Sequence, residues 1–201
     1  MKKSRTLIIL LTIILTFSYV VVTAAYNEAP MLKDKVDKGL LPPLKLRLPE
    51  KPKVVKPESE IGEYGGTLKK LQAARSFYLM WEPLVKKMGD YKLHSNLAKD
   101  WNVNENMTEF TFNLRKGIKW SDGEPYTTED ILFWYKDIIM NDEITPTKPA
   151  WSKGAEVKAI DDYTVKFIFE KPRSTFLTNV YQIKWGQAAI HRAPKHYMKK
   201  F

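Results

Sequence analysis

The chain of 201 residues contains no cysteine and only three histidines. The lack of cysteine excludes disulfides, thiolate metal ligands, cysteine nucleophiles and a lipid anchor attached to cysteine. His191 and His196 are five residues apart, so they do not share one face of a helix. Together with His94, they give little support for a metal site or a general base.

Catalytic motifs are also missing. The sequence has no GxSxG nucleophile elbow, no phosphate-binding loop and no GxGxxG dinucleotide fingerprint. The acid pairs Glu129-Asp130 and Asp161-Asp162 stand where a helix start and a turn would use them, so a structural role outweighs a catalytic one. We therefore expect no catalytic residues, no metal and no cofactor, and a protein that is not an enzyme.

The formal net charge of +10 is concentrated in one part of the chain. Residues 1–57 contain eleven Lys or Arg and four Asp or Glu, whereas residues 58–201 contain twenty-two and nineteen. A nucleic-acid-binding protein normally carries its positive charge on the folded domain. The distribution argues against nucleic acid as a partner.

Residues 1–25 combine a basic start, an uncharged apolar run at 7–22 and small residues at 23–25. This pattern is typical of a signal peptide cleaved after Ala24 or Ala25, and an uncleaved N-terminal anchor is the alternative. Either way, the basic start places the rest of the chain outside the cytoplasm. Residues 26–60 contain six prolines among many lysines, so we expect an irregular linker without a regular helix.

Residues 61–201 contain the pattern of a folded domain. Residues 108–115 alternate between apolar and polar side chains, which predicts a half-buried strand. Thr127 and Asp130 predict a capped helix start, and residues 156–170 predict a hairpin that turns at Asp161-Asp162. The other expected elements are a turn entering a strand at 64–68, a broken helix at 77–88, a helical turn at 97–101, a short strand at 118–120, a helix at 174–181 and a helix starting at Pro194.

Residues 97–101 (LAKDW), 110–120 (FTFNLRKGIKW) and 122–131 (DGEPYTTEDI) resemble the signature of the family 5 extracellular solute-binding proteins. These proteins are the oligopeptide-, dipeptide- and nickel-binding receptors of ABC importers. Weaker similarities occur at 65–68, 81–84, 160–165 and 194–197. The resemblance implies an α+β (mixed α/β) fold, with residues 61–201 forming part of the first lobe of a type II periplasmic-binding-protein-like fold.

The resemblance also implies a function. It predicts an exported, monomeric protein at the periplasmic or extracellular face of the membrane, which binds a peptide or similar small solute and delivers it to an ABC permease. The second lobe of the family is absent, and the stretch between Leu68 and Trp81 is shorter than usual. We therefore expect an N-terminal portion that does not bind tightly alone. The alternative is an anchored or secreted structural remnant without transport activity, and a hydrolase is disfavoured.

The ligand-binding residues are unknown at this point. Trp151 and Trp185 are weak candidates for exposed aromatic side chains near a cleft, and a role in the hydrophobic core is an equal alternative. Peptides, oligosaccharides, nickel chelates and haem all occur as solutes in the family that the sequence resembles. The sequence does not choose between them.

Overall fold

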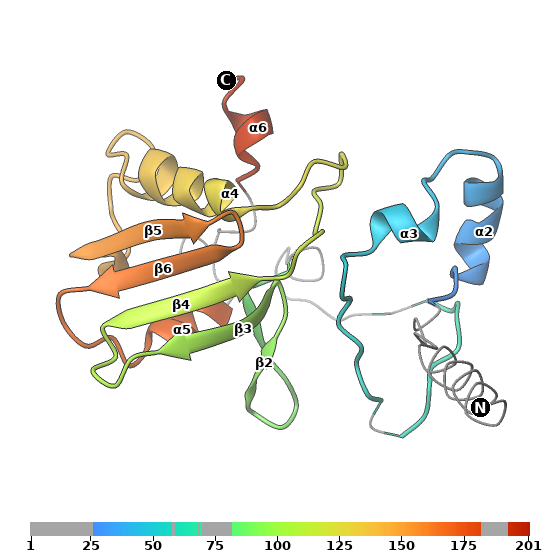
Figure 1. Cartoon of the computed structure of the whole chain (residues 1–201), viewed down its shortest axis with the longest axis horizontal. Helices are drawn as coiled ribbons and strands as arrows, with labels where there is room; N and C mark the ends of the chain where they lie inside the picture. Colours follow the sequence, from blue (N-terminus) through green and yellow to red (C-terminus); the bar gives the residue numbers. More distant parts are fainter. Residues whose placement is uncertain (1–25, 58, 68, 70–81, 182–192) are drawn as a thin grey trace, which may run out of the picture.

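The computed structural model describes residues 26–57, 59–67, 69, 82–181 and 193–201. Its centre is a four-stranded antiparallel sheet with the order β3-β4-β6-β5 (Figure 1). The strands are β3 (Ala98–Val103), β4 (Glu109–Leu114), β5 (Ala155–Asp161) and β6 (Thr164–Phe169). A separate hairpin pairs β1 (Val85–Lys87) with β2 (Leu93–Ser95).

The alternation in β4 and β6 determines which face of the sheet is buried. Side chains of one set are at most 3% exposed and form the inner face, namely Phe110, Phe112, Leu114, Val165, Phe167 and Phe169. The opposite face carries polar groups, including the Lys166 ammonium 2.9 Å from the Glu109 carboxylate. This two-sided pattern confirms the strand predicted at 108–115 and the hairpin predicted at 156–170.

Helices cover the inner face. α4 (Thr128–Phe133) continues directly into a π-helical turn, η2 (Trp134–Ile139), and η3 (Ala150–Ser152) is a short 3-10 helix. α5 (Phe176–Tyr181) follows β6, and its Phe176 ring packs 4.8 Å from Phe169 and 4.9 Å from Phe110. The Trp134 and Trp151 rings stack 5.6 Å apart within the same core.

The start of α4 is the capping box predicted from sequence. Thr127 Oγ1 accepts a hydrogen bond from the backbone N–H of Glu129, and Asp130 Oδ2 accepts one from the N–H of Thr127. The helix therefore begins with its free N–H groups satisfied and with acidic side chains near its positive end. Gly123, with φ of +95°, turns the chain just before this helix as expected.

Two local predictions for the domain are wrong. The expected helical turn at 97–101 is strand β3, because pairing with β4 supplies hydrogen bonds that a single turn would lack. The irregular register between Ala98 and Asp100 obscures the alternation that would have revealed the strand. Residues 85–87 are strand β1 rather than part of a broken helix, and residues 77–81 of that prediction lie outside the described residues.

Three shorter predictions have mixed outcomes. Residues 118–120 form no strand and make only the isolated bridge between Lys119 and Pro125. The helix expected at 174–181 begins later, at Phe176, and α6 (Lys195–Met198) begins directly after Pro194. Gly65 and Gly66 adopt positive φ as a turn requires, but the start of the strand expected there lies outside the described residues.

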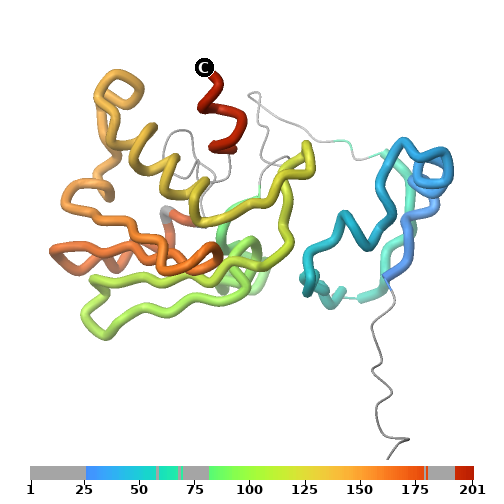
Figure 2. The backbone as a smooth tube through the Cα atoms, turned by 45° about the horizontal axis from the view of Figure 1, so that its top comes forward, coloured from blue at the N-terminus to red at the C-terminus, as the bar shows by residue number. Residues whose placement is uncertain are grey.

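Residues 26–57, here called the arm, contain regular structure that the sequence did not predict. α2 (Pro30–Asp37) has proline at its first helical position, and α3 (Leu44–Arg47) follows Pro43. Proline is tolerated at both places because the first N–H groups of a helix have no partner within the helix. The expectation of an arm without any helix is therefore wrong. Figures 1 and 2 show the arm beside the sheet, next to the loop that follows β4.

Candidate functional site

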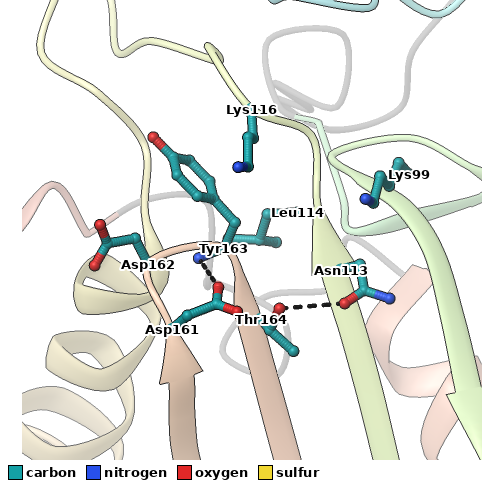
Figure 3. A pocket seen from close by; sticks show the side chains of 8 residues that line it. All are labelled: Lys99, Asn113, Leu114, Lys116, Asp161, Asp162, Tyr163 and Thr164. Atoms are coloured by element: carbon teal, nitrogen blue, oxygen red, sulfur yellow. Dashed lines mark hydrogen bonds between the residues drawn. The ribbon is translucent and has the colours of Figure 1, made fainter.

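A hollow of about 450 Å³ lies at one end of the sheet, where β4 ends and where β5 turns into β6 (Figure 3). The residues that line it come from three separate parts of the sequence, which the antiparallel pairing brings together. They are Lys99, Asn113, Leu114, Lys116, Asp161, Asp162, Tyr163 and Thr164.

Hydrogen bonds fix the hairpin turn against the end of β4. The Leu114 N–H donates to the Tyr163 carbonyl at 2.6 Å, and the Tyr163 N–H donates to Asp161 Oδ1 at 2.7 Å. The Thr164 hydroxyl donates to Asn113 Oδ1 at 3.2 Å across the two strands (Figure 3). The floor of the hollow is thus held by backbone and side-chain contacts of the sheet itself.

The hollow carries both signs of charge. The Tyr163 N–H, followed by the Thr164 hydroxyl, lowers the pKa of the Asp161 carboxyl below its usual value, and the nearby Lys116 ammonium contributes to the same effect. The Lys116 Nζ also lies 5.3 Å from the centre of the Tyr163 ring. A charged or strongly polar group is therefore the kind of ligand that this surface suits.

The side chains that line the hollow are mostly charged or polar. They include neither histidine nor cysteine, so the usual general base and the thiolate nucleophile are both missing from the hollow. Within the part of the chain that the structure describes, no group of three or more His, Cys, Asp or Glu side chains could hold a metal ion. The hollow can hold a solute by charge and hydrogen bonding, and it is open at the surface.

Of the two tryptophans proposed from sequence, the structure describes only Trp151. Trp151 is only 5% exposed and packs in the core against Trp134, so its expected exposure is wrong and the core alternative is confirmed. The reason is that η3 turns the ring inward, where it also contacts Phe176. Trp185 lies outside the described residues, and a ligand contact by either tryptophan stays untested.

The acid pairs have the structural roles predicted for them. Asp130 is 4% exposed, and its Oδ1 accepts a hydrogen bond from the Lys195 N–H at 2.9 Å, while Oδ2 caps α4. The Lys195 ammonium lies 2.6 Å from Glu129, and His196 Nε2 lies 2.7 Å from Asp122 Oδ2. These contacts tie α6 to the start of α4. His94 contacts Asp90 at the surface, and His191 lies outside the described residues.

The contact between His196 and Asp122 predicts a pH dependence. The hydrogen bond from His196 is the largest favourable cause that holds the pKa of Asp122 below its usual value of 3.8. A lowered carboxyl pKa means that the contact stabilises α6 above pH 3.8 and is lost as pH falls through the lowered pKa. In His196→Ala, a carbon-13 NMR titration should show the pKa of Asp122 rising toward its usual value, whereas that of Asp161 should not move. An unchanged pKa of Asp122 would show that the contact is absent in solution.

Solved structures of solute-binding proteins have a similar fold. The chain matches an oligopeptide-binding protein OppA with a TM-score of 0.76 and 45% identity, over 87% of this chain and 28% of that one. It matches the periplasmic binding protein MelB from Agrobacterium fabrum C58, solved with stachyose, with a TM-score of 0.70 and 29% identity, over 88% and 30%. The fold is therefore mixed α+β and forms part of a solute-binding-protein fold.

The family follows from the sequence comparison. Residues 92–197 match the model of the bacterial extracellular solute-binding proteins, family 5 Middle, so the chain belongs to this family. It is 28% identical over 190 residues to the periplasmic alpha-galactoside-binding protein of Rhizobium meliloti. It is 29% identical over 121 residues to the dipeptide-binding protein of Escherichia coli. The family consists of substrate-binding receptors.

The matched stretches include part of the arm, but they cover only part of each relative. A match over 87% of the chain includes more residues than 58–201 contain, so the similarity to OppA reaches into the arm. The chain spans about a quarter of the length of the curated relatives, covering 27% of the galactoside-binding protein and 22% of the dipeptide-binding protein. None of the helices in the described part of the chain has the length and apolar character needed to cross a membrane.

Proposed function

We propose that this chain is the N-terminal part of the solute-binding component of an ABC importer, with residues 61–201 in its first lobe. The observation that carries the proposal is the family match at residues 92–197, supported by the similarity in fold to an oligopeptide-binding protein. The solute would be a peptide or a similar small polar molecule. The curated relatives named above bind an alpha-galactoside and a dipeptide, so both classes are included in the test.

The proposal includes the chain's location and partners. A signal peptide or anchor at residues 1–25 would bring the lobe to the outer face of the cell membrane, where an ABC permease would receive the solute. We propose a monomer without enzymatic activity, consistent with a hollow lined by groups that bind but do not form a nucleophile and base. A screen for peptidase and glycosidase activity should show no turnover.

Disruption of the gene tests the proposal directly. Uptake of a labelled oligopeptide or of labelled stachyose should fall in the disrupted strain and recover when the gene is returned. Uptake of an unrelated labelled sugar, carried by another system, serves as the control. If the uptake of both solutes is unchanged, the chain is better explained as a structural remnant without transport activity.

The isolated chain should bind these solutes weakly. Receptors of this kind gain affinity by closing two walls over the solute and excluding water, and one lobe supplies one wall. In isothermal titration calorimetry of the 201-residue chain, we expect no binding of a tripeptide or of stachyose at micromolar concentrations. An intact oligopeptide-binding receptor gives the positive control. Micromolar affinity of the chain alone would overturn this expectation.

A further inference from the structure

The arm crosses the turn that follows β4, and three polar contacts join them. The Glu50 N–H donates to the Lys116 carbonyl at 3.1 Å. The Arg115 Nη1 donates to the Lys51 carbonyl at 2.8 Å, and the Lys119 Nζ donates to the Leu46 carbonyl at 2.9 Å. All three bonds involve backbone groups of the arm, so they depend on its path more than on its side chains. The contacts join residues separated by 64 or more positions.

Gly117 is at the centre of this crossing. Its φ is +82°, and a Cβ atom added there would lie 3.0 Å from the Glu50 nitrogen and 3.2 Å from the Pro49 Cα. Both atoms belong to the backbone, so they cannot move aside as the end of a flexible side chain would. The close approach of the arm therefore requires a residue without a side chain at position 117.

The arm also has contacts that hold its own shape. The Arg47 guanidinium pairs with Glu28, nineteen positions earlier, and Arg47 Nε donates to the Pro42 carbonyl at 2.8 Å. A mainly apolar hollow of about 480 Å³ is lined mostly by the arm, including its Tyr26, leucines and prolines. Gly117 and Lys119 of the domain also line it. Further along, the pKa of Lys53 is lowered by partial burial and by the nearby Lys86 and Arg115. The arm thus lies against the domain from Leu46 to Lys53.

From these contacts we propose that residues 46–53 are a latch that closes on the Gly117 turn and makes the arm a folded part of the lobe. The spacer predicted from the prolines would have no such preferred position. The similarity to OppA that reaches into the arm agrees with a shared structural element. The proposal does not depend on which solute is bound, and its test uses no solute.

Trypsin provides the test, because Arg47 and Lys53 are cleavage sites within the latch, whereas the bond after Lys51 is protected by Pro52. In Gly117→Ala the added methyl group should open the latch, and cleavage at these sites should become about tenfold faster, as expected for the loss of one or two hydrogen bonds. Gly123→Ala is the matched control, since Gly123 has φ of +95° but nothing within 4 Å of its added Cβ. It carries the same backbone strain without touching the arm.

Cleavage at Lys166, in the central strand β6, reports global unfolding in the same digest. If Gly117→Ala also exposes Lys166, the double variant Arg115→Gln/Lys119→Gln replaces it, because it removes two latch contacts without changing the turn backbone. Faster cleavage confined to the latch supports the proposal. Equal rates for the latch variants and Gly123→Ala, or rapid cleavage at Arg47 and Lys53 in the wild type, would overturn it.

Discussion

Replacement of Phe176 by alanine should destabilise the domain by about 3–5 kcal/mol, the usual cost of removing a phenylalanine from a packed core. Phe176 is 2% exposed, and its ring lies within 6 Å of four others. Those rings belong to β4, β6 and η3, namely Phe110, Phe167, Phe169 and Trp151. The alanine variant would leave a cavity at the point where α5 joins the sheet.

Urea unfolding followed by circular dichroism measures this effect. Phe176→Leu is the control, because a hydrophobic side chain of similar volume usually costs less than about 1.5 kcal/mol in a core. A loss below about 1 kcal/mol for the alanine variant, within the range of surface substitutions and small repacking changes, would show that α5 does not close the core in solution.

Replacement of Asp130 by alanine should cost about 3–6 kcal/mol, the loss of two hydrogen bonds to a charged group. Its buried carboxylate accepts two backbone hydrogen bonds, from Thr127 and from Lys195, and hydrogen bonds to charged groups contribute about 1.5–3 kcal/mol each. The variant leaves both N–H groups without this acceptor. It therefore removes the cap of α4 and the attachment of α6 in one step.

Two variants separate these roles of Asp130. Thr127→Ala removes only the side-chain cap on Glu129 and should cost about 1 kcal/mol. Asp130→Asn keeps one carbonyl oxygen and should lose less than the alanine variant. Hydrogen exchange at the Lys195 N–H should accelerate in Asp130→Ala and remain slow in Thr127→Ala. If both alanine variants have the same stability and the same exchange at Lys195, the tie to α6 contributes nothing.

The elements that were predicted correctly have local causes. The strand β4 alternates without interruption, α4 begins with a complete capping box, and the β5–β6 hairpin turns at two adjacent aspartates. In each case neighbouring residues provide the pattern, the cap or the turn. A local reading of the sequence is sufficient when the stabilising partners are close in sequence.

The elements that were missed depend on partners far along the chain. Strand β3 is defined by its pairing with β4, and the arm is positioned by the turn at Lys116 and Gly117, more than 60 residues away. The prolines of the arm suggested irregular structure because proline is unfavourable inside a helix. Their placement at helix starts, which reverses that conclusion, becomes clear only when the helix boundaries are known.

The candidate site was harder to predict than the fold. Its lysines, Lys99 and Lys116, carry no sequence signal that distinguishes them from other surface lysines, and they meet the Asp161–Thr164 turn only through the sheet. Trp151 was a weak candidate for an exposed aromatic side chain near a cleft, but the same large apolar ring is equally suited to a core. Only the stacking on Trp134 decides between the two.

The π-helical turn η2 shows how a helix can accommodate one extra residue. The Met140 N–H donates to the Tyr135 carbonyl five positions earlier, at 2.9 Å, so this turn holds one residue more than an α-helical turn. Deletion of that extra residue would return this turn to α-helical geometry, and the positions after it would keep their orientation relative to the core. Here the gain or loss of a single codon can be absorbed within one turn of helix, while the loops on either side keep their length.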